Sequence, residues 1–245
     1  MATIAENLQA VKERIARAAT AARREPSSVR LLAVSKTHPL ALVEQAFAAG
    51  QRAFGENYVR EALDKMAQWS RLDERRASSD GRRSIEWHLI GALQSNKTRA
   101  AAERFDWVQT VASEKIARRL SEQRPAGHPP LNVLVQVNVS GEATKSGVSP
   151  ASVPVLCEAV KGLKNLELRG LMAIPEPTDD VSLQRARFAE VRRLFDGLNA
   201  RGFGLDTLSM GMSDDLEAAI AEGATLVRVG TAIFGARQRA KALPA

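Results

Sequence analysis

The sequence has a single cysteine, Cys157, inside the apolar run VPVLCEAV. One cysteine cannot form a disulfide within the chain, and proteins of reducing compartments are poor in disulfides. The three histidines, His38, His88 and His128, lie far apart in the sequence, and no cluster of cysteine and histidine has the spacing of a metal site. The sequence therefore predicts a cytoplasmic protein without a metal site.

Long hydrophobic runs are also absent, since no apolar stretch approaches the ~20 residues that span a bilayer. The first twenty residues lack the apolar core of a signal peptide and have the pattern of an amphipathic helix. Aromatic residues make up 4% of the chain, which leaves few side chains for stacking on bases. The net charge of +7 comes from scattered lysines and arginines, so we expect an anionic small ligand and neither a membrane nor a nucleic acid as partner.

Short apolar runs alternate with amphipathic stretches along the 245 residues. Several of these runs are almost continuously apolar, as strands covered on both faces should be. The predicted strands are residues 29–36, 52–56, 85–91, 105–111, 131–140, 166–174, 207–211 and 225–230. Predicted helices lie between several of them, for example at residues 39–50, 57–69 and 181–200.

Eight strands with intervening helices and no break in composition predict an α/β protein with a single (β/α)8 TIM-type barrel over residues 1–245. The alternative is an open, doubly wound sheet. Two polar segments, residues 70–84 and 122–130, interrupt the alternation and are predicted to be surface loops.

Functional side chains of such a barrel lie at the C-terminal ends of the strands and in the loops that follow. The first predicted strand, in VRLLAVSKTHP, ends in Lys36. A lysine in an apolar site either has a partner or loses its charge, and a neutral amine is a nucleophile. A lysine at a strand end can also simply extend to solvent, so its role depends on the neighbouring loops.

The last two loops have the composition of a phosphate site. In SMGMSDDLEAAI, Gly211 separates a strand from a helix that Ser213 or Asp214 could cap. In VRVGTAIFG, Gly230 and Thr231 follow the last strand. Small residues let backbone N–H groups approach an anion, and the loops after strands seven and eight commonly bind phosphate in this architecture. Either loop alone could be a tight turn, but the pair favours phosphate.

Arg228 lies between Val227 and Val229 and points into the barrel if those valines face the helices. A buried guanidinium needs an acceptor, which Glu56, Glu86 or a ligand could supply. Barrel closure brings Arg228 and the phosphate loops beside Lys36. A ligand with a phosphate, a ring acceptor and a carbonyl fits this set, and pyridoxal 5′-phosphate (PLP) has all three, with Lys36 forming a Schiff base.

Six ordered blocks of the sequence give a more specific indication. The chain resembles the family of YggS- and PROSC-like pyridoxal phosphate homeostasis proteins, whose barrel is related to the N-terminal domain of alanine racemase. The resemblance covers nearly the whole chain and rests on AVSKTHP, FGENYVRE, WHLIGALQSNK, VNVSGEATKSG, LRGLMAIP and LSMGMSDDLEAAIAEGATLVRVGTAIFG.

The resemblance implies roles for single residues. Lys36 would be the Schiff-base lysine, and Arg228 would face the pyridine nitrogen of PLP. Asn57 would be a polar neighbour of the ring. The phosphate would be bound by Ser209, Gly230 and Thr231. The chain departs from many relatives at His38, where they have a second lysine.

The resemblance implies a PLP carrier that buffers the cofactor without robust catalysis and could deliver it to apo-enzymes that require PLP. The alternative is an amino-acid racemase, which needs an acid or base on each face of the α-carbon. Tyr58 is the only tyrosine, and the ten residues after GTAIFG lead us to expect no second domain and a monomer. A class I aldolase-like enzyme and a nucleic-acid-binding module are further alternatives, resting on Lys36 alone and on charge alone.

Overall fold

The computed structural model describes residues 2–76, 85–140 and 146–236. Eight parallel strands follow one another around a closed barrel, because β8 pairs with β1 as well as with β7. The strands are β1 Arg30–Val34, β2 Ala53–Glu56, β3 Glu86–Leu89, β4 Trp107–Val111, β5 Leu131–Val137, β6 Leu166–Ala173, β7 Thr207–Ser209 and β8 Leu226–Val229. The closed barrel confirms the predicted fold class, and the open doubly wound sheet is wrong.

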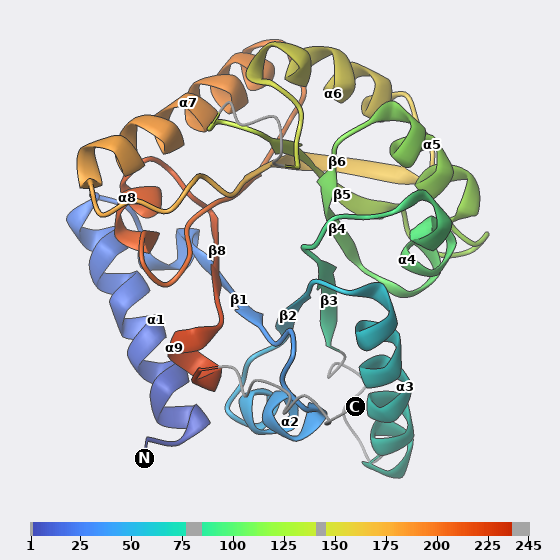
Figure 1. The fold of residues 1–245 in the computed structure, drawn as a ribbon, viewed down its shortest axis with the longest axis vertical. Coiled ribbons are helices and arrows are strands. Elements are labelled where there is room, and N and C mark those ends of the chain that lie inside the picture. The colour runs from blue at the N-terminus through green and yellow to red at the C-terminus, as the bar shows by residue number, and fades with distance from the viewer. Residues whose placement is uncertain (1, 77–84, 141–145, 237–245) are drawn as a thin grey trace, which may run out of the picture.

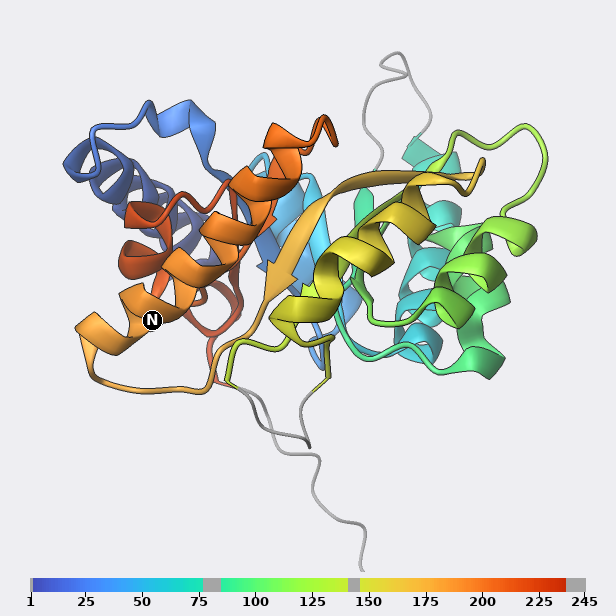
Figure 2. The same ribbon diagram turned by 90° about the horizontal axis from the view of Figure 1, so that it is seen from above.

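Helices surround the barrel, and the C-terminal ends of the strands face the viewer in Figure 1. Figure 2, turned by 90°, shows the barrel from the side, with helices flanking the strands. The α-helices of the described residues are α1 Ile4–Ala21, α2 Leu40–Ala48, α3 Val59–Arg76, α4 Thr98–Arg104, α5 Glu114–Gln123, α6 Val153–Lys161, α7 Val181–Ala200, α8 Leu216–Ala221 and α9 Thr231–Phe234. The described residues also form three short 3-10 helices, at Pro26–Ser28, Ser95–Lys97 and Pro150–Ser152.

The N-terminal helix α1 shows how sequence pattern sets the packing. Thr3 and Glu6 form a capping box, in which each side chain accepts a hydrogen bond from the other residue's backbone N–H. Leu8, Val11 and Ile15 recur at helical spacing and are buried against the barrel. The expected amphipathic helix is confirmed, and its buried face lies against α8 and α9.

Side chains alternate between the two faces of each strand. Val227 and Val229 belong to the large core between strands and helices, so the two valines face the helices as expected. Arg228, between them, is 3% exposed and points into the barrel. The barrel interior therefore holds polar groups as well as small apolar clusters, and these polar groups lead to the ligand site described below.

Several sequence-based boundaries change. Residues 70–76 continue helix α3, so the loop predicted at 70–84 is wrong over this part, and residues 77–84 lie outside the described residues. Strand β7 ends at Ser209, two residues early, because Gly211 turns the chain with φ of 94°. The segment after Gln123 is a loop, as predicted. Within the described ranges, no helix has the length and apolar character needed to span a membrane.

Candidate cofactor site at the C-terminal end of the barrel

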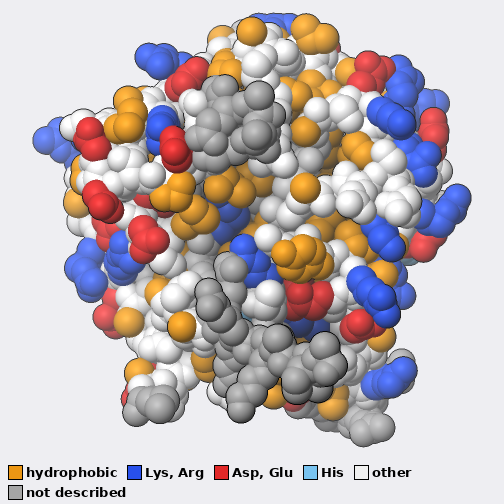
Figure 3. Space-filling view, in the orientation of Figure 1, with side chains coloured by type: hydrophobic (Ala, Val, Ile, Leu, Met, Phe, Trp, Pro, Cys, Tyr) orange, Lys and Arg blue, Asp and Glu red, His pale blue; other side chains and the backbone are white. Residues whose placement is uncertain are grey.

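A cavity of about 470 Å³ opens at the C-terminal ends of the strands. It brings together residues from β1, β8 and the loops that follow β2 and β7. The lining residues are Arg14, Val34, Lys36, His38, Asn57, Ile90, Ile174, Met212, Ser213, Asp214, Arg228, Gly230, Thr231 and Ala232. Figure 3 shows the molecule from this side, with Lys and Arg side chains around a hollow near the middle. Five of the six residues predicted to bind a cofactor line this cavity, and Ser209 does not.

Lys36 follows β1 and lines the cavity, as predicted. Its two neighbours in sequence are held from outside the barrel. The carbonyl oxygen of Ser35 accepts a hydrogen bond from Nζ of Lys65 at 2.8 Å, and the backbone N–H of Thr37 donates to Oε1 of Glu61 at 2.6 Å. Thr37 has a φ of 63°, which is an unusual conformation for a β-branched residue. These contacts fix the backbone on both sides of Lys36.

A buried lysine organises these contacts. Lys65 in α3 is 5% exposed, and its ammonium also donates to Oε1 of Glu56 and to Oε1 of Glu61, each at 2.8 Å. The hydroxyl of Ser35 donates to the same oxygen of Glu56 at 2.6 Å. Burial raises the pKa of the Glu56 carboxyl above its usual range, although Lys65 and Ser35 both act to lower it. Three acceptors surround the amine of Lys65, which holds it in one position beside the loop of Lys36.

Gly230 lies against the end of β1. A Cβ placed on Gly230 would come 3.0 Å from the carbonyl oxygen of Val34 and 3.3 Å from its Cβ. A side chain at this position would push apart β8 and β1 where they meet beside Lys36. Thr231 begins the four-residue helix α9 and is exposed to the cavity. The predicted short helical run after Gly230 is therefore present.

The loop after β7 brings Ser213 to the cavity. A Cβ on Gly211 would lie 2.6 Å from the Cβ of Ala219, so only glycine fits between this turn and α8. Arg14 of α1 donates to the carbonyl oxygen of Ser213 at 2.7 Å and anchors the loop from the outside. The cap of α8 is Asp215, which accepts from the N–H of Met212 at 2.6 Å, so the predicted capping by Ser213 or Asp214 is wrong.

Ser209 occupies a different place from the expected one. It is fully buried at the end of β7, below the cavity, and its hydroxyl donates to Oε1 of Gln109 at 2.6 Å. The hydroxyl oxygen of Ser209 also accepts a hydrogen bond from Nη1 of Arg228 at 2.8 Å. Both functions of the hydroxyl are used inside the barrel, so the geometry favours Ser213 over Ser209 as the serine beside an anion.

Arg228 has neither of the carboxylate partners that the sequence suggested. Its Nη2 donates to the carbonyl oxygen of Ala173 at 2.8 Å, and its Nη1 donates to Ser209. Glu56 is paired with Lys65, and Glu86 accepts from Arg30 and lies 2.7 Å from His88. Burial lowers the pKa of the Arg228 guanidinium to about 10, which still leaves it protonated at neutral pH. Within the part of the chain that the structure describes, no carboxylate forms an ion pair with this cation, which faces the cavity.

Asn57 is placed by a close approach between two loops. A Cβ on Gly91, which follows β3, would lie 2.1 Å from the carbonyl oxygen of Asn57. Only a glycine lets the backbone after β2 pack at this distance.

His38 also lines the cavity, and its ring centroid lies 5.3 Å from that of Phe234. Tyr58 is 60% exposed and does not line the cavity.

Sequence reasoning missed three residues that build the site: Arg14, Lys65 and Gln109. Arg14 and Lys65 lie on amphipathic helices, and helical periodicity alone does not show which charged side chain reaches a loop of the site. Gln109 stands in the middle of an apolar strand, VQTV, where a buried amide was a usable signal. Across the described ranges there is no group of histidine, cysteine and carboxylate side chains that could hold a metal ion.

Comparison with known proteins places the chain in a family. The model of the alanine racemase N-terminal domain matches residues 7–238. The pyridoxal phosphate homeostasis protein of Pseudomonas aeruginosa is 61% identical over 97% of each chain, and that of Escherichia coli K12 is 50% identical over 98% of this chain and all of its own. The structure of PipY from Synechococcus elongatus PCC7942 with PLP bound has 37% identity and a TM-score of 0.80, and the match covers 95% of this chain and 100% of PipY. The chain therefore belongs to the alanine racemase N-terminal domain family and, within it, to the pyridoxal phosphate homeostasis proteins.

Proposed function

We propose that this chain binds PLP reversibly in the cavity at the C-terminal end of the barrel and so buffers the cofactor. The observation that carries this proposal is the convergence of Lys36, Arg228, Gly230 and Thr231 on one cavity. The relatives are named pyridoxal phosphate homeostasis proteins, and the PipY structure holds PLP.

The donor set of the cavity fits PLP. An amine is needed for the aldehyde, small and hydroxyl residues for the phosphate, and a partner for the ring nitrogen. Lys36 supplies the amine, and Arg228 supplies the partner. Gly230, whose missing side chain keeps the β1–β8 contact close, would bind phosphate together with Thr231 and Ser213. Asn57 lines the space that the ring would fill.

Covalent attachment would proceed through Lys36. Its nitrogen bonds to the aldehyde carbon of PLP, and the aldehyde oxygen leaves as water, which gives a Schiff base. The reverse reaction with water releases the cofactor. Reversible storage requires no further chemistry from the protein.

A cation opposite the ring nitrogen supports a carrier over a catalyst. Bound PLP supplies an electron sink when its ring nitrogen is protonated, and a nearby acid keeps it so. Arg228 is a protonated guanidinium and disfavours a second positive charge on that nitrogen. A ring held in this way withdraws electrons weakly, which suits storage and release.

The racemase alternative lacks a tyrosine among the residues that line the cavity. Racemisation needs a proton acceptor or donor on each face of the α-carbon, and Lys36 can serve one face. Tyr58, the only tyrosine of the sequence, is exposed and does not line the cavity. We therefore propose that the protein has no robust racemase activity.

Several finer expectations extend this proposal. We propose that residues 1–245 form one PLP-binding domain, that the chain works as a cytoplasmic monomer, and that apo-enzymes requiring PLP receive the cofactor from it. Light scattering tests the monomer, and cell fractionation tests the location. PLP transfer to an apo-enzyme that is faster than spontaneous release would favour delivery, whereas transfer at the rate of release would leave buffering alone.

The central experiment is reduction of the protein in the presence of PLP. Borohydride should fix the cofactor to Lys36, as located by mass spectrometry, and Lys36→Ala should lose the imine absorption band. Lys164→Ala, at an exposed position outside the cavity, is the control and should behave as wild type. An adduct on another lysine, such as Lys145, which lies outside the described residues, would overturn the assignment.

Incubation of the PLP-bound protein with L-alanine in deuterated water tests the absence of catalysis. Exchange of the α-proton at rates typical of enzymes, roughly 1–1000 per second, would contradict the carrier proposal.

A further inference from the structure

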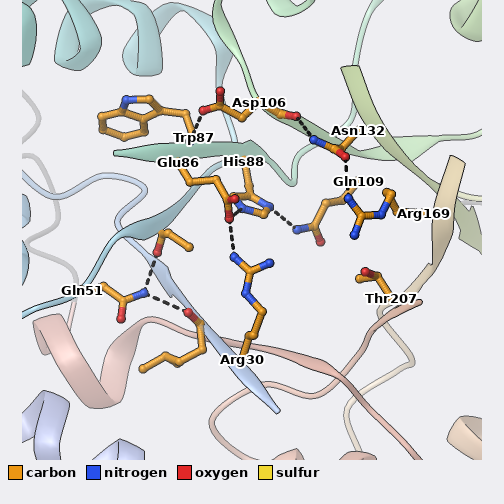
Figure 4. A network of polar contacts seen from close by, with 12 residues as sticks. Arg30, Gln51, Glu86, Trp87, His88, Asp106, Gln109, Asn132, Arg169 and Thr207 are labelled. Atoms are coloured by element: carbon orange, nitrogen blue, oxygen red, sulfur yellow. Dashed lines mark hydrogen bonds and ion pairs between the residues drawn. The ribbon is translucent and has the colours of Figure 1, made fainter. Parts of the chain in front are cut away.

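A chain of hydrogen bonds runs through the barrel interior from Arg228 to the opposite end. Arg228 donates to Ser209 at 2.8 Å, and Ser209 donates to Gln109 at 2.6 Å. The amide nitrogen of Gln109 lies 2.8 Å from Nδ1 of His88, whose Nε2 lies 2.7 Å from Oε1 of Glu86. Figure 4 shows the part of this chain that runs from Gln109 through His88 to Glu86. Glu86 also accepts a hydrogen bond from Arg30. The residues of this chain come from four strands: β8, β7, β4 and β3. Of these residues, Arg228 lines the cavity.

The direction of donation along this chain is fixed from its carboxylate end. The Glu86 carboxylate can only accept, so Nε2 of His88 carries the hydrogen. His88 is completely buried, and burial lowers the pKa of its imidazole, which keeps it neutral and leaves Nδ1 as an acceptor. The Gln109 amide must then donate to His88 and turn its oxygen toward Ser209.

This order reaches the guanidinium of Arg228. With its hydrogen donated to Gln109, the Ser209 oxygen presents a lone pair to Nη1 of Arg228. Every donor between Arg228 and Glu86 therefore points toward the carboxylate. The buried cation is connected to the Glu86 carboxylate through three neutral groups, although no carboxylate of the described residues pairs with it directly.

The packing around the chain holds its members in place. The His88 ring stacks on Trp107, with centroids 5.2 Å apart and planes inclined by 10°, and the Arg169 guanidinium lies over the same Trp107 ring, 5.1 Å from its centroid. Gln109 and Ser209 are each fully buried. A side chain confined in this way has few alternative rotamers, so its orientation is transmitted to its neighbour.

We infer that Gln109 and His88 are positioning residues for Arg228: through Ser209 they set the direction in which the guanidinium faces the ring nitrogen of bound PLP. This inference rests on the proposed role of Arg228. It adds residues of β3 and β4, which do not reach the cavity, to the machinery that tunes the cofactor.

The test uses PLP labelled with nitrogen-15 in the ring and reads the ring-nitrogen chemical shift in the PLP-bound protein. Arg228→Met should move this shift, because it removes the cation. Gln109→Met should move it in the same direction and should weaken PLP binding about fivefold, as expected for one lost hydrogen bond of about 1 kcal/mol. Gln51→Met is the matched control, because Gln51 is a buried glutamine that donates to the Leu31 and Ala53 carbonyls outside this chain.

The outcomes separate the inference from the proposed function. If Arg228→Met moves the shift and Gln109→Met does not, the inference is overturned while the role of Arg228 stands. If Gln51→Met moves it as far as Gln109→Met, general loosening explains the change and the inference is again overturned. If Arg228→Met leaves the shift unchanged, the proposed contact of Arg228 with the ring nitrogen is wrong, and the inference that depends on it falls too.

A smaller substitution covers the case in which Gln109→Met does not fold. Ser209→Ala interrupts the same chain with little change of volume and should reproduce the shift. Where both variants fold, the double variant should move the shift no further than either single one, because both act through one guanidinium. Additive changes would contradict a shared route.

Discussion

The ammonium of Lys65 lies 2.8 Å from Oε1 of Glu56 and 2.8 Å from the carbonyl oxygen of Ser35, the residue before Lys36. Through Glu61 the same ammonium is connected to the N–H of Thr37, the residue after Lys36. A second, buried lysine therefore holds the backbone on both sides of Lys36, the lysine proposed to bind PLP. The two have different chemistry, because Lys65 is enclosed by acceptors and Lys36 lines an open cavity.

Lys65→Met should destabilise the protein strongly. It leaves the Glu56 carboxyl buried without its cation, and loss of one partner of a buried pair costs about 3–5 kcal/mol of unfolding free energy. Urea denaturation of the protein without PLP measures this loss. The double variant Lys65→Met/Glu56→Gln should recover part of it, because the buried charge is gone. A loss below about 1 kcal/mol for Lys65→Met would show that the pair contributes little.

Acid should destabilise the protein through Glu86. Burial raises the pKa of this carboxyl, but His88 and Arg30 together lower it more, to about 2 from the usual 4.5. Between these two values the unfolded chain binds the proton and the folded chain does not, so the unfolding free energy falls as pH decreases from about 4.5 to about 2. Urea denaturation at about pH 5.5 and about pH 3 should show a smaller loss for Glu86→Gln than for wild type. Glu103→Gln, at a carboxylate 3.8 Å from Arg99, is the control and should keep the wild-type loss; an equal loss in all three proteins would contradict the assignment.

The order of strands was predictable because buried parallel strands are short, apolar and separated by amphipathic helices. Barrel closure followed from their number, and it made β8 the neighbour of β1, so the proximity of Lys36 and Gly230 was predictable too. Helix ends were less predictable. The arginine-rich sequence after Ser70 has a polar composition that suits a loop, yet α3 continues through Arg76, because arginine, leucine and glutamate have high helix propensity.

The partners of the buried polar residues could not be predicted. The alternation around Arg228 showed that it points inward, but alternation does not show which strand supplies the acceptor across the barrel. The acceptors are Ser209 and a backbone carbonyl at Ala173, and a carbonyl leaves no signal in the sequence. The same limit explains Ser209 and Ser213, which lie four residues apart around a tight turn, one inside the barrel and one in the cavity.

Ser209→Ala and Ser213→Ala should differ in their effects on the binding of PLP and of pyridoxal. A hydroxyl that binds phosphate contributes roughly 1.5–3 kcal/mol, so Ser213→Ala should weaken PLP binding about tenfold or more. Binding of pyridoxal, which lacks the phosphate, should hardly change in Ser213→Ala. Ser209→Ala should weaken both ligands by the same factor, because its hydroxyl contacts Arg228. Isothermal titration measures the affinity of each variant for both ligands. If Ser209→Ala weakened the binding of PLP but not of pyridoxal, Ser209 would be a phosphate-binding residue.

Gly91→Ala should damage the site from a position outside the cavity lining. The new Cβ would lie 2.1 Å from the carbonyl oxygen of Asn57, a distance no relaxed structure tolerates, so the loop after β2 must move. We expect a loss of more than about 1 kcal/mol in unfolding free energy and weaker PLP binding, since Asn57 lines the cavity.

Gly197→Ala is the matched control. Gly197 lies in α7, and a Cβ at this position would meet nothing within 4 Å. Alanine should therefore stabilise the helix by roughly 0.5–1 kcal/mol and leave PLP binding unchanged. Urea denaturation and PLP titration of both variants check the pair, and a Gly91→Ala protein with wild-type affinity would show that the loop position of Asn57 does not matter for the cofactor.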